Sequence, residues 1–240
     1  MDVLGLEAYI DRWSRAHGGY DVRSSRPTFA WLRLAHGLAL PLARRGFRPT
    51  TVTAVGALGA VAVAPVAWLG GRWPLLAAVL VVVVAVLDGI DGAVAEMTDS
   101  ATAWGRILDQ VVDRVGDLGM VTGLWLLGAP GPLCAAAAVL TMFDESVRSS
   151  AGAEGVAEVG LVTVAERPSR LVIAGLSFLV AGAVPLVAVA AVTVGASLWA
   201  FLALVSALQL LVNVRRRLRG VPRNVARADG DETADPSELP

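Results

Sequence analysis

The sequence predicts an all-α membrane protein with six transmembrane helices and an N-terminal helix along the cytoplasmic membrane surface. Two observations support this fold class. Of the 240 residues, 55% are hydrophobic and 17% are charged, whereas soluble domains average about 25% charged residues. Four long segments also lack any charged side chain: 49–71, 73–87, 118–143 and 171–214. A single spanning helix needs about 20 mostly apolar residues.

These segments divide into six expected spans. The 44 residues of 171–214 are enough for a helical hairpin, and the turn sequence Gly128-Ala129-Pro130-Gly131-Pro132 interrupts 118–143. The alternative is a soluble protein with a large helical core, in which so many long charge-free runs are rare. The expected spans are 50–70, 74–95, 105–127, 133–149, 171–190 and 194–214.

The distribution of arginine predicts how the helices cross the membrane. All 20 basic residues are Arg; eight of them precede residue 49, and Arg215, Arg216, Arg217 and Arg219 follow the last span. Cytoplasmic segments are enriched in positive charge. We therefore expect a multi-pass protein of the cell membrane with both termini in the cytoplasm, which requires an even number of spans. Tryptophans expected at the outer interface are Trp68, Trp73 and Trp125.

The chain is expected to have three parts. Residues 1–48 form a cytoplasmic segment, in which Thr28–Ala43 is semi-apolar and suits an interfacial helix or a soluble helix packed on the bundle. Residues 49–217 form the six-helix domain. Residues 218–240 form an acidic, proline-containing cytoplasmic tail without expected order. A net charge of −1 gives no indication of nucleic-acid binding, and the single cysteine excludes an internal disulfide.

An acidic segment breaks the apolar pattern. Asp88 and Asp91 are three residues apart at the end of the second span, and Asp109 and Asp113 are four apart near the start of the third. Residues at these spacings share one helix face, so two antiparallel helices can direct four carboxylates to one point. An aspartate in a membrane costs about 2.5–3.5 kcal/mol. Bound cations offset this cost, and carboxylates without His or Cys suit two Mg²⁺ or Mn²⁺ ions.

Glycines flank these acids. Gly89, Gly92 and Gly105 permit either a ligand or a neighbouring helix to approach the backbone closely. Taken singly, each glycine indicates helix packing. Beside four aspartates, Gly92 and Gly105 are expected to face a ligand.

The spacing resembles the signature of CDP-alcohol phosphotransferases, D-x2-D-G-x2-A-R-x8-G-x3-D-x3-D. Every spacing matches, and seven of the eight named positions carry the expected residue. The resemblance extends over Pro49–Arg217 and includes a bacterial-type stretch at Ala165–Arg170. The signature reads here Asp88-x2-Asp91-Gly92-x2-Ala95-Glu96-x8-Gly105-x3-Asp109-x3-Asp113.

The resemblance implies that 49–217 is a catalytic domain and that the protein is a homodimer, in which the small residues of Gly56–Ala60 could form a close helix contact. It implies transfer of a substituted phosphate from a CDP-linked donor, such as CDP-diacylglycerol, to an alcohol, with release of CMP, in phospholipid biosynthesis. The implied metal ligands are Asp88, Asp91, Asp109 and Asp113, the last also being the candidate general base. The positions that leave room for the nucleotide are Gly92, Ala95 and Gly105.

Glu96 departs from the signature, which has Arg at this position. Three interpretations remain open: Arg106 or Arg114 supplies the missing charge, Glu96 contacts a different substrate, or the chain is a weakened relative. For Arg114, an ion pair with Asp117 at i+3 is the alternative role.

The acceptor site is expected to contain Arg148, Arg167 and Arg170, since arginines at the cytoplasmic mouth could bind a phosphorylated alcohol such as inositol phosphate. Positive-inside topology explains the same residues equally well. Bacterial members of this kind with phosphorylated acceptors carry more arginine than Val147–Gly152 does here. The sequence therefore does not identify the acceptor.

Two other classes of function compete with an enzyme. Intramembrane aspartates also occur in cation transporters, but here they lie near one membrane face and none occurs in the last two spans. A non-catalytic membrane scaffold is the second class. The four carboxylates argue against a scaffold, because carboxylates without a function would only destabilise the helix bundle.

Overall fold

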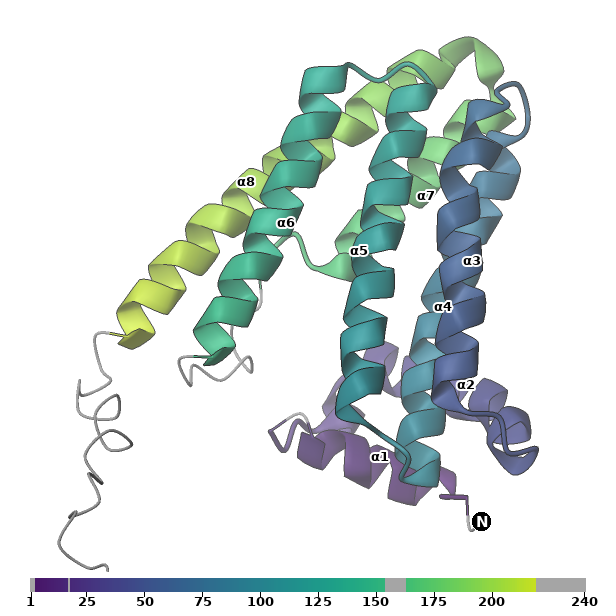
Figure 1. Cartoon of the computed structure of the whole chain (residues 1–240), viewed down its shortest axis with the longest axis vertical. Helices are drawn as coiled ribbons and strands as arrows, with labels where there is room; N and C mark the ends of the chain where they lie inside the picture. Colours follow the sequence, from purple (N-terminus) through teal and green to yellow (C-terminus); the bar gives the residue numbers. More distant parts are fainter. Residues whose placement is uncertain (1–2, 17, 154–162, 219–240) are drawn as a thin grey trace, which may run out of the picture.

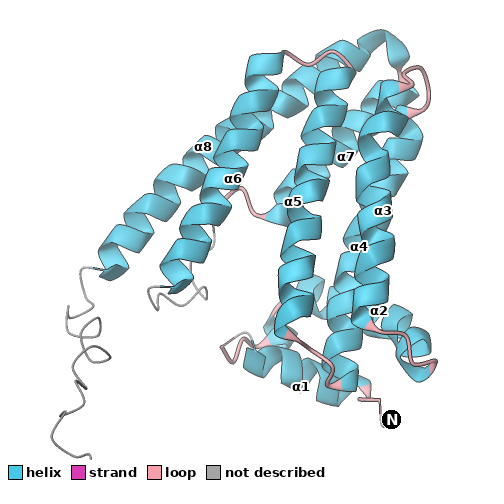
Figure 2. Cartoon of the chain, viewed as in Figure 1, coloured by secondary structure: helices cyan, strands magenta, loops and turns pink. Residues whose placement is uncertain are grey.

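The computed structural model describes residues 3–16, 18–153 and 163–218, and these residues fold into helices joined by short connections (Figure 2). Its elements, in chain order, are α1 (Leu6–Ala16), the short 3-10 turn η1 (Val22–Ser24), α2 (Arg26–Arg44), α3 (Pro49–Trp68), α4 (Pro74–Thr98), α5 (Ala103–Leu126), α6 (Gly131–Ala153), α7 (Arg167–Ala183), the 3-10 turn η2 (Pro185–Val187) and α8 (Ala188–Leu218).

Each of the six expected spans overlaps one of the long helices α3 to α8, but the break between the last two lies at 184–187 and not at 191–193 as expected. The expected span 171–190 therefore runs past the end of α7 into α8. Among the residues that the structure describes, three segments are long and apolar enough to cross a membrane by length and composition: Pro49–Trp68, Pro74–Thr98 and Pro185–Leu218. Charged side chains lie along α5, and α7 has only 17 residues. The chain is thus an all-helical membrane protein with three clear candidate spans, and the six-span topology stays a prediction.

The N-terminal region contains more structure than the single helix expected at 28–43. That helix exists as α2, which begins where the Ser25 side chain accepts a hydrogen bond from the Thr28 backbone N–H. The preceding helix α1 was missed, because its eleven residues are polar apart from one narrow face. Both helices lie across the lower ends of α3, α4 and α5 in Figure 1. The position of α2 in the membrane interface stays a prediction.

Small residues bring α3 and α5 close together. A Cβ atom built on Gly119 would lie 2.9 Å from the backbone carbonyl oxygen of Ala60, and one on Gly116 would lie 3.7 Å from the Ala60 Cβ. Because an atom that close to a rigid carbonyl cannot be accommodated, only glycine permits this approach at 119. The contact fixes α5, and with it the acidic residues that α5 carries.

At the other side of the bundle, α6 and α8 form a pair (Figure 1). The buried Trp199 indole of α8 donates a hydrogen bond to the Thr141 hydroxyl of α6 at 3.0 Å. Phe178 of α7 is also fully buried and belongs to the same apolar cluster as Trp199. This cluster joins α6, α7 and α8 to the upper parts of α3, α4 and α5.

A tight connection holds α4 and α5 antiparallel. Helix α4 ends at Thr98 and is followed by Asp99, whose φ of 52° is in the left-handed region. The Thr102 hydroxyl accepts a hydrogen bond from the Gly105 N–H at the start of α5. Asp88 lies ten residues before the last residue of α4, and Asp113 lies ten residues after the first residue of α5. At 1.5 Å per residue, both are about 15 Å from the turn. The fold therefore brings the acids of the two helices to one level.

Arg12 of α1 secures the end of α4. Its guanidinium donates to the Glu96 backbone carbonyl at 2.9 Å and to the Asp99 carboxylate at 2.5 Å, and it lies 3.6 Å from the Glu96 carboxylate. A cation is favourable at a helix C-terminus, where carbonyl groups lack partners. Burial raises the pKa of the Tyr9 hydroxyl on α1 to about 12, and the negative charge of Glu96 adds to this increase. The Glu96 carboxylate therefore faces α1.

We expect Arg12→Ala to lower the free energy of unfolding by about 1 kcal/mol, because a partly exposed pair and a helix-end contact are lost together. Chemical denaturation in detergent and hydrogen exchange of α1 measure this effect. Arg23→Ala is the matched control, since Arg23 pairs with Glu7 on the exposed surface. Equal destabilisation by both variants would contradict the role of Arg12.

Candidate metal centre and adjoining cavity

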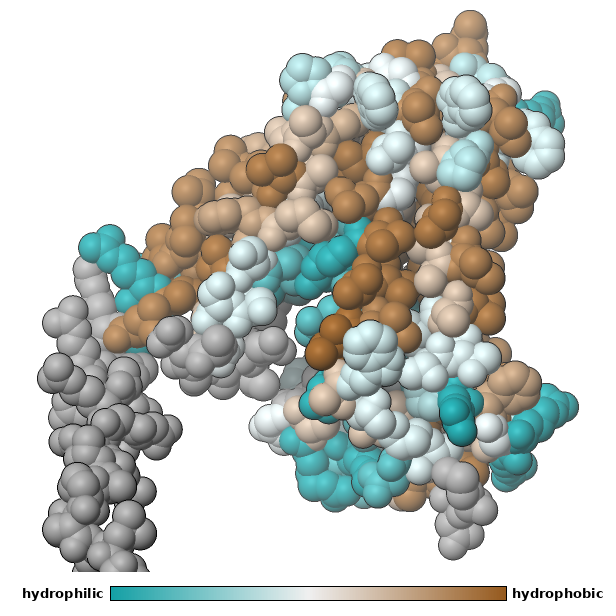
Figure 3. All heavy atoms as spheres, in the orientation of Figure 1, coloured by the Kyte–Doolittle hydropathy of each residue, from teal (hydrophilic) through white to brown (hydrophobic). Residues whose placement is uncertain are grey.

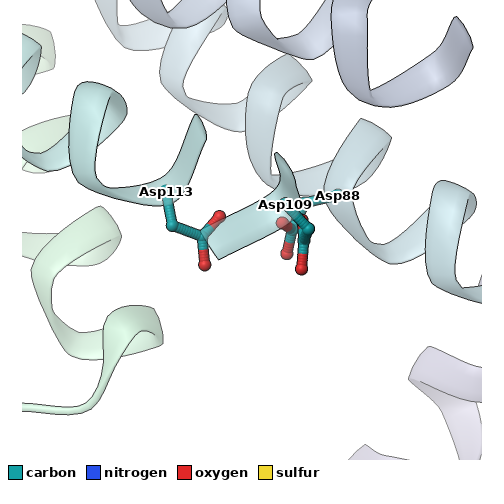
Figure 4. Close-up of side chains that lie close together, drawn as sticks. All are labelled: Asp88, Asp109 and Asp113. Atoms are coloured by element: carbon teal, nitrogen blue, oxygen red, sulfur yellow. The ribbon is translucent and has the colours of Figure 1, made fainter. Parts of the chain in front are cut away.

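Three aspartates on α4 and α5 meet at one point. Each of Asp88, Asp109 and Asp113 offers a carboxylate oxygen, and these oxygens lie within 4.8 Å of one another (Figure 4). In Figure 4 the carboxylates of Asp88 and Asp109 lie side by side, and that of Asp113 is turned towards them. The arrangement brings together three of the four carboxylates that the sequence predicts to converge.

Asp91 lies next to this cluster but faces α3. Its side chain is buried and accepts a hydrogen bond of 2.6 Å from the Thr53 hydroxyl. Asp88, Asp91 and Asp109 line a small shared cavity. The fourth predicted acid is therefore at the site, held by a hydroxyl partner that sequence spacing did not reveal.

A single guanidinium lies among the carboxylates. Arg167, at the first residue of α7, approaches Asp88 to 2.5 Å and also forms an ion pair with Asp113. Its one positive charge faces four neighbouring acids, so negative charge remains to be balanced. Clustered carboxylate oxygens without nitrogen or sulfur ligands fit Mg²⁺ or Mn²⁺. The donor set thus fits the divalent ions that the sequence predicts.

A cavity of about 350 Å³ adjoins the cluster and reaches between α3, α4 and α5. All three positions expected at the nucleotide, Gly92, Ala95 and Gly105, line it. A Cβ atom on Gly92 would meet open space, whereas one on Gly89 would lie 2.5 Å from the Trp31 ring of α2. Gly89 therefore serves helix packing, and Gly92 faces the cavity.

Two arginines line the same cavity. Arg106, one of the expected candidates, extends from the first turns of α5, and Arg48 precedes α3. Arg48 was not among the expected site residues, because its position before a span is explained by topology alone. Glu96 is absent from the lining and pairs with Arg12 instead.

Arg114 points elsewhere. Its guanidinium donates a hydrogen bond of 2.8 Å to the Glu145 carboxylate of α6. The expected i+3 ion pair with Asp117 is replaced by this contact between helices, because Asp117 pairs with Arg170 of α7 at 3.4 Å. Sequence spacing within α5 could not reveal a partner on α6.

The three arginines predicted for the acceptor occupy different surroundings. Arg167 lies in the aspartate cluster. Arg170 is only 4% exposed and pairs with Asp117 and Glu145, while Arg148 pairs with Glu166. Figure 3 shows hydrophilic atoms in the hollow between the α6–α8 pair and the lower part of the bundle. A carboxylate of the same chain contacts each of the three arginines.

Comparison with known proteins identifies relatives. The family model described as CDP-alcohol phosphatidyltransferase matches residues 47–221. Phosphatidylinositol phosphate synthase of Mycobacteroides abscessus is 35% identical over 159 residues, which cover 62% of this chain and 69% of that protein. The Streptomyces avermitilis protein of the same name is 32% identical over 188 residues, covering 73% and 75%.

A solved structure shares the fold. Mycobacterium tuberculosis phosphatidylinositol phosphate synthase (PgsA1) with CDP-DAG bound has a TM-score of 0.64 and 28% identity, and the match covers 76% of this chain and 94% of that one. The same protein was also solved in complex with manganese and citrate. Together with the aspartate cluster, these matches establish a divalent metal as the cofactor.

We expect Mn²⁺ to stabilise the purified protein through the aspartate cluster. At a free Mn²⁺ concentration 100 times the dissociation constant, the gain in unfolding free energy is about 2.7 kcal/mol. Thermal unfolding in detergent, with and without EDTA, measures it. Asp88→Asn combined with Asp113→Asn should abolish the gain, and Asp11→Asn, an exposed change on α1, should preserve it. Equal stabilisation of the double variant would place the metal elsewhere.

Proposed function

The chain belongs to the CDP-alcohol phosphatidyltransferase family, and we propose that it transfers a phosphatidyl group from CDP-diacylglycerol to an alcohol and releases CMP. The observation that carries this proposal is the convergence of Asp88, Asp109 and Asp113 beside a cavity of nucleotide size. A lipid-tailed donor with a water-soluble head group suits a site on membrane helices near their polar end.

The donor's head group would occupy the cavity lined by Gly92, Ala95 and Gly105. Open space at Gly92 lets a planar base or a ribose approach the backbone of α4. Arg48 and Arg106 supply positive charge at the same cavity, and guanidinium groups bind phosphate oxygens with two parallel hydrogen bonds. These features support a cytidine diphosphate ligand here.

The four aspartates would hold two divalent ions. Such ions supply positive charge that stabilises the bridging and leaving oxygens of the diphosphate. Asp88, Asp109 and Asp113 offer converging oxygens, and Thr53 fixes the orientation of Asp91 by its hydrogen bond. The proximity of these side chains supports a two-ion site.

Asp113 is the proposed general base. Its side chain is 16% exposed and lies at the end of the cluster towards α7. An acceptor hydroxyl there would pass its proton to the Asp113 carboxylate as its oxygen bonds to the phosphatidyl phosphorus. The bond from that phosphorus to the bridging oxygen breaks, and CMP leaves with this oxygen. A positioned carboxylate is effective even with a low intrinsic basicity.

Glu96 is proposed as a structural residue and Arg106 as the substitute for the family's arginine. Glu96 contacts Arg12 of α1, Arg114 contacts Glu145, and Arg106 lines the cavity. These contacts favour the first of the three interpretations of Glu96. The other two, a different donor and a weakened relative acting as a membrane scaffold, are outcomes of the experiments below.

The proposed topology has six spans with both termini in the cytoplasm. Trp68, Trp73 and Trp125 are exposed and lie at the ends of α3, α4 and α5 remote from the aspartates, as expected of an outer interface. A homodimer is proposed from the family alone. The small residues of Gly56–Ala60 do not support it, since Gly56, Gly59 and Ala60 face α4 and α5 of the same chain.

Arg106→Ala should raise the KM for CDP-diacylglycerol about tenfold, because one charge-assisted phosphate contact is lost. Steady-state release of CMP by protein in detergent measures it. Arg72→Ala is the control, since Arg72 lies in the α3–α4 connection remote from the cavity. An unchanged KM in the Arg106 variant would exclude Arg106 as a donor ligand.

Asp113→Asn should reduce CMP release more than about 100-fold, because the acceptor proton loses its base. Calorimetric binding of CDP, expected to stay within about tenfold of wild type, verifies that the nucleotide cavity is intact. Near-full turnover would refute the assignment of Asp113. Absence of metal-dependent CMP release from folded wild-type protein would refute the proposed enzyme and favour a scaffold.

A further inference from the structure

The arginines predicted to bind the acceptor, and Arg114 beside them, all form ion pairs with carboxylates of the same chain. In the part of the chain that the structure describes, each arginine of α5, α6 and α7 near the aspartate cluster contacts at least one carboxylate. Arg106 of α5 is not part of this group, because it lines the cavity proposed for the donor. The four neutralised arginines are Arg114, Arg148, Arg167 and Arg170.

Glu145 of α6 is central to this neutralisation. One of its carboxylate oxygens accepts a hydrogen bond from Arg114 at 2.8 Å, and the other accepts one from Arg170 at 3.1 Å. Arg170 also lies 3.4 Å from Asp117, which is 1% exposed. Two arginines and two carboxylates thus form a compact network between α5, α6 and α7. Charges buried to this degree need their partners.

Glu166 neutralises Arg148 in a second network. Its carboxylate accepts hydrogen bonds from the Arg148 guanidinium at 2.8 Å and from the Thr163 backbone N–H at 2.9 Å. Arg148 donates a further bond to the Thr163 hydroxyl at 2.9 Å. The sequence between 149 and 166 contains Glu154, Glu158 and Glu166 and no basic residue.

The charges at the site indicate which acceptor fits. Arg167 contacts Asp88 and Asp113, so its charge belongs to the metal cluster, and the networks around Glu145 and Glu166 compensate the other three arginines. A phosphate dianion would compete with Glu145 and Glu166 for these guanidinium groups. A guanidinium turned away from Glu145 would leave that carboxylate, whose side chain is 18% exposed, without its partner and close to the new negative charge. A hydroxyl group, in contrast, hydrogen-bonds to a paired guanidinium without displacing anything.

We infer that the acceptor alcohol carries no phosphate group and is an uncharged polyol. The inference rests on the proposed function, since it concerns the second substrate of the same reaction. Arg148 and Arg170 then serve as hydrogen-bond donors to hydroxyl groups within neutral ion-pair networks. The name phosphatidylinositol phosphate synthase describes a phosphorylated product, so this chain would differ from its named relatives in the class of acceptor.

The first test compares matched acceptors. Purified protein in detergent with CDP-diacylglycerol and Mg²⁺ receives either inositol or inositol phosphate, and either glycerol or glycerol phosphate. We expect CMP release at least tenfold faster with the uncharged member of a pair. Faster release with the phosphorylated member overturns the acceptor inference and leaves the proposed function standing. No release with any acceptor overturns the proposed function.

The second test does not depend on turnover. Calorimetry measures binding of inositol phosphate to the Mg²⁺-loaded protein, with weaker than millimolar affinity expected for wild type. Glu145→Gln removes a carboxylate charge from Arg114 and from Arg170, which keeps Asp117 as its partner. Glu166→Gln removes the carboxylate charge beside Arg148 without touching the buried network. Each should tighten inositol phosphate binding at least tenfold. Glu7→Gln, which removes a carboxylate from the exposed pair with Arg23, is the matched control and should change nothing.

Submillimolar binding of inositol phosphate by wild type would overturn the inference. So would unchanged binding in both glutamine variants, provided that CDP still binds to them and shows that they are folded. A gain in Glu166→Gln alone would support the inference through Arg148 even where Glu145→Gln fails to fold.

Discussion

Four carboxylates on the adjacent helices α4 and α5 are the constraint on which the rest of this structure depends. Uncompensated, they would repel one another and resist insertion into the bilayer. The chain holds them together by a tight turn between α4 and α5, by the close approach of α3 and α5 at Gly119, and by the Thr53 hydroxyl. One arginine offsets part of the charge, and divalent cations account for the remainder. The requirement for metal follows from electrostatics as much as from chemistry.

The N-terminal helices contribute to the same constraint from outside the bundle. Arg12 caps the end of α4, and Trp31 packs on Gly89 within the acidic segment. The carboxylate of Glu96 is engaged in the first of these contacts. A position where the family signature has arginine has therefore become part of the fold, and positive charge at the cavity comes from α5 and from the residue before α3.

Sequence spacing predicted the centre of the site but not its surroundings. Periodicity places Asp109 and Asp113 on one face of α5, and charge-free runs indicated the six long helices, because both are properties of a single helix. The break between α7 and α8 was expected at 191–193 but lies at 184–187, since no charge marks it. Helix α1 was missed because a short amphipathic helix is stabilised by packing on other helices, here α2 and α4. The partners of Arg114 and Arg170 lie on other helices, so no local pattern indicates Glu145. Contacts between helices were beyond what spacing alone can reveal.

The most direct test of the central claim is anomalous diffraction from crystals of the protein grown with Mn²⁺. The electrostatics of the cluster predict an anomalous peak within coordination distance of Asp88, Asp109 and Asp113, about 2.2 Å from the oxygens, with the Arg167 guanidinium withdrawn from Asp88. Manganese bound elsewhere, with Arg167 still between Asp88 and Asp113, would contradict the assignment of these aspartates as metal ligands.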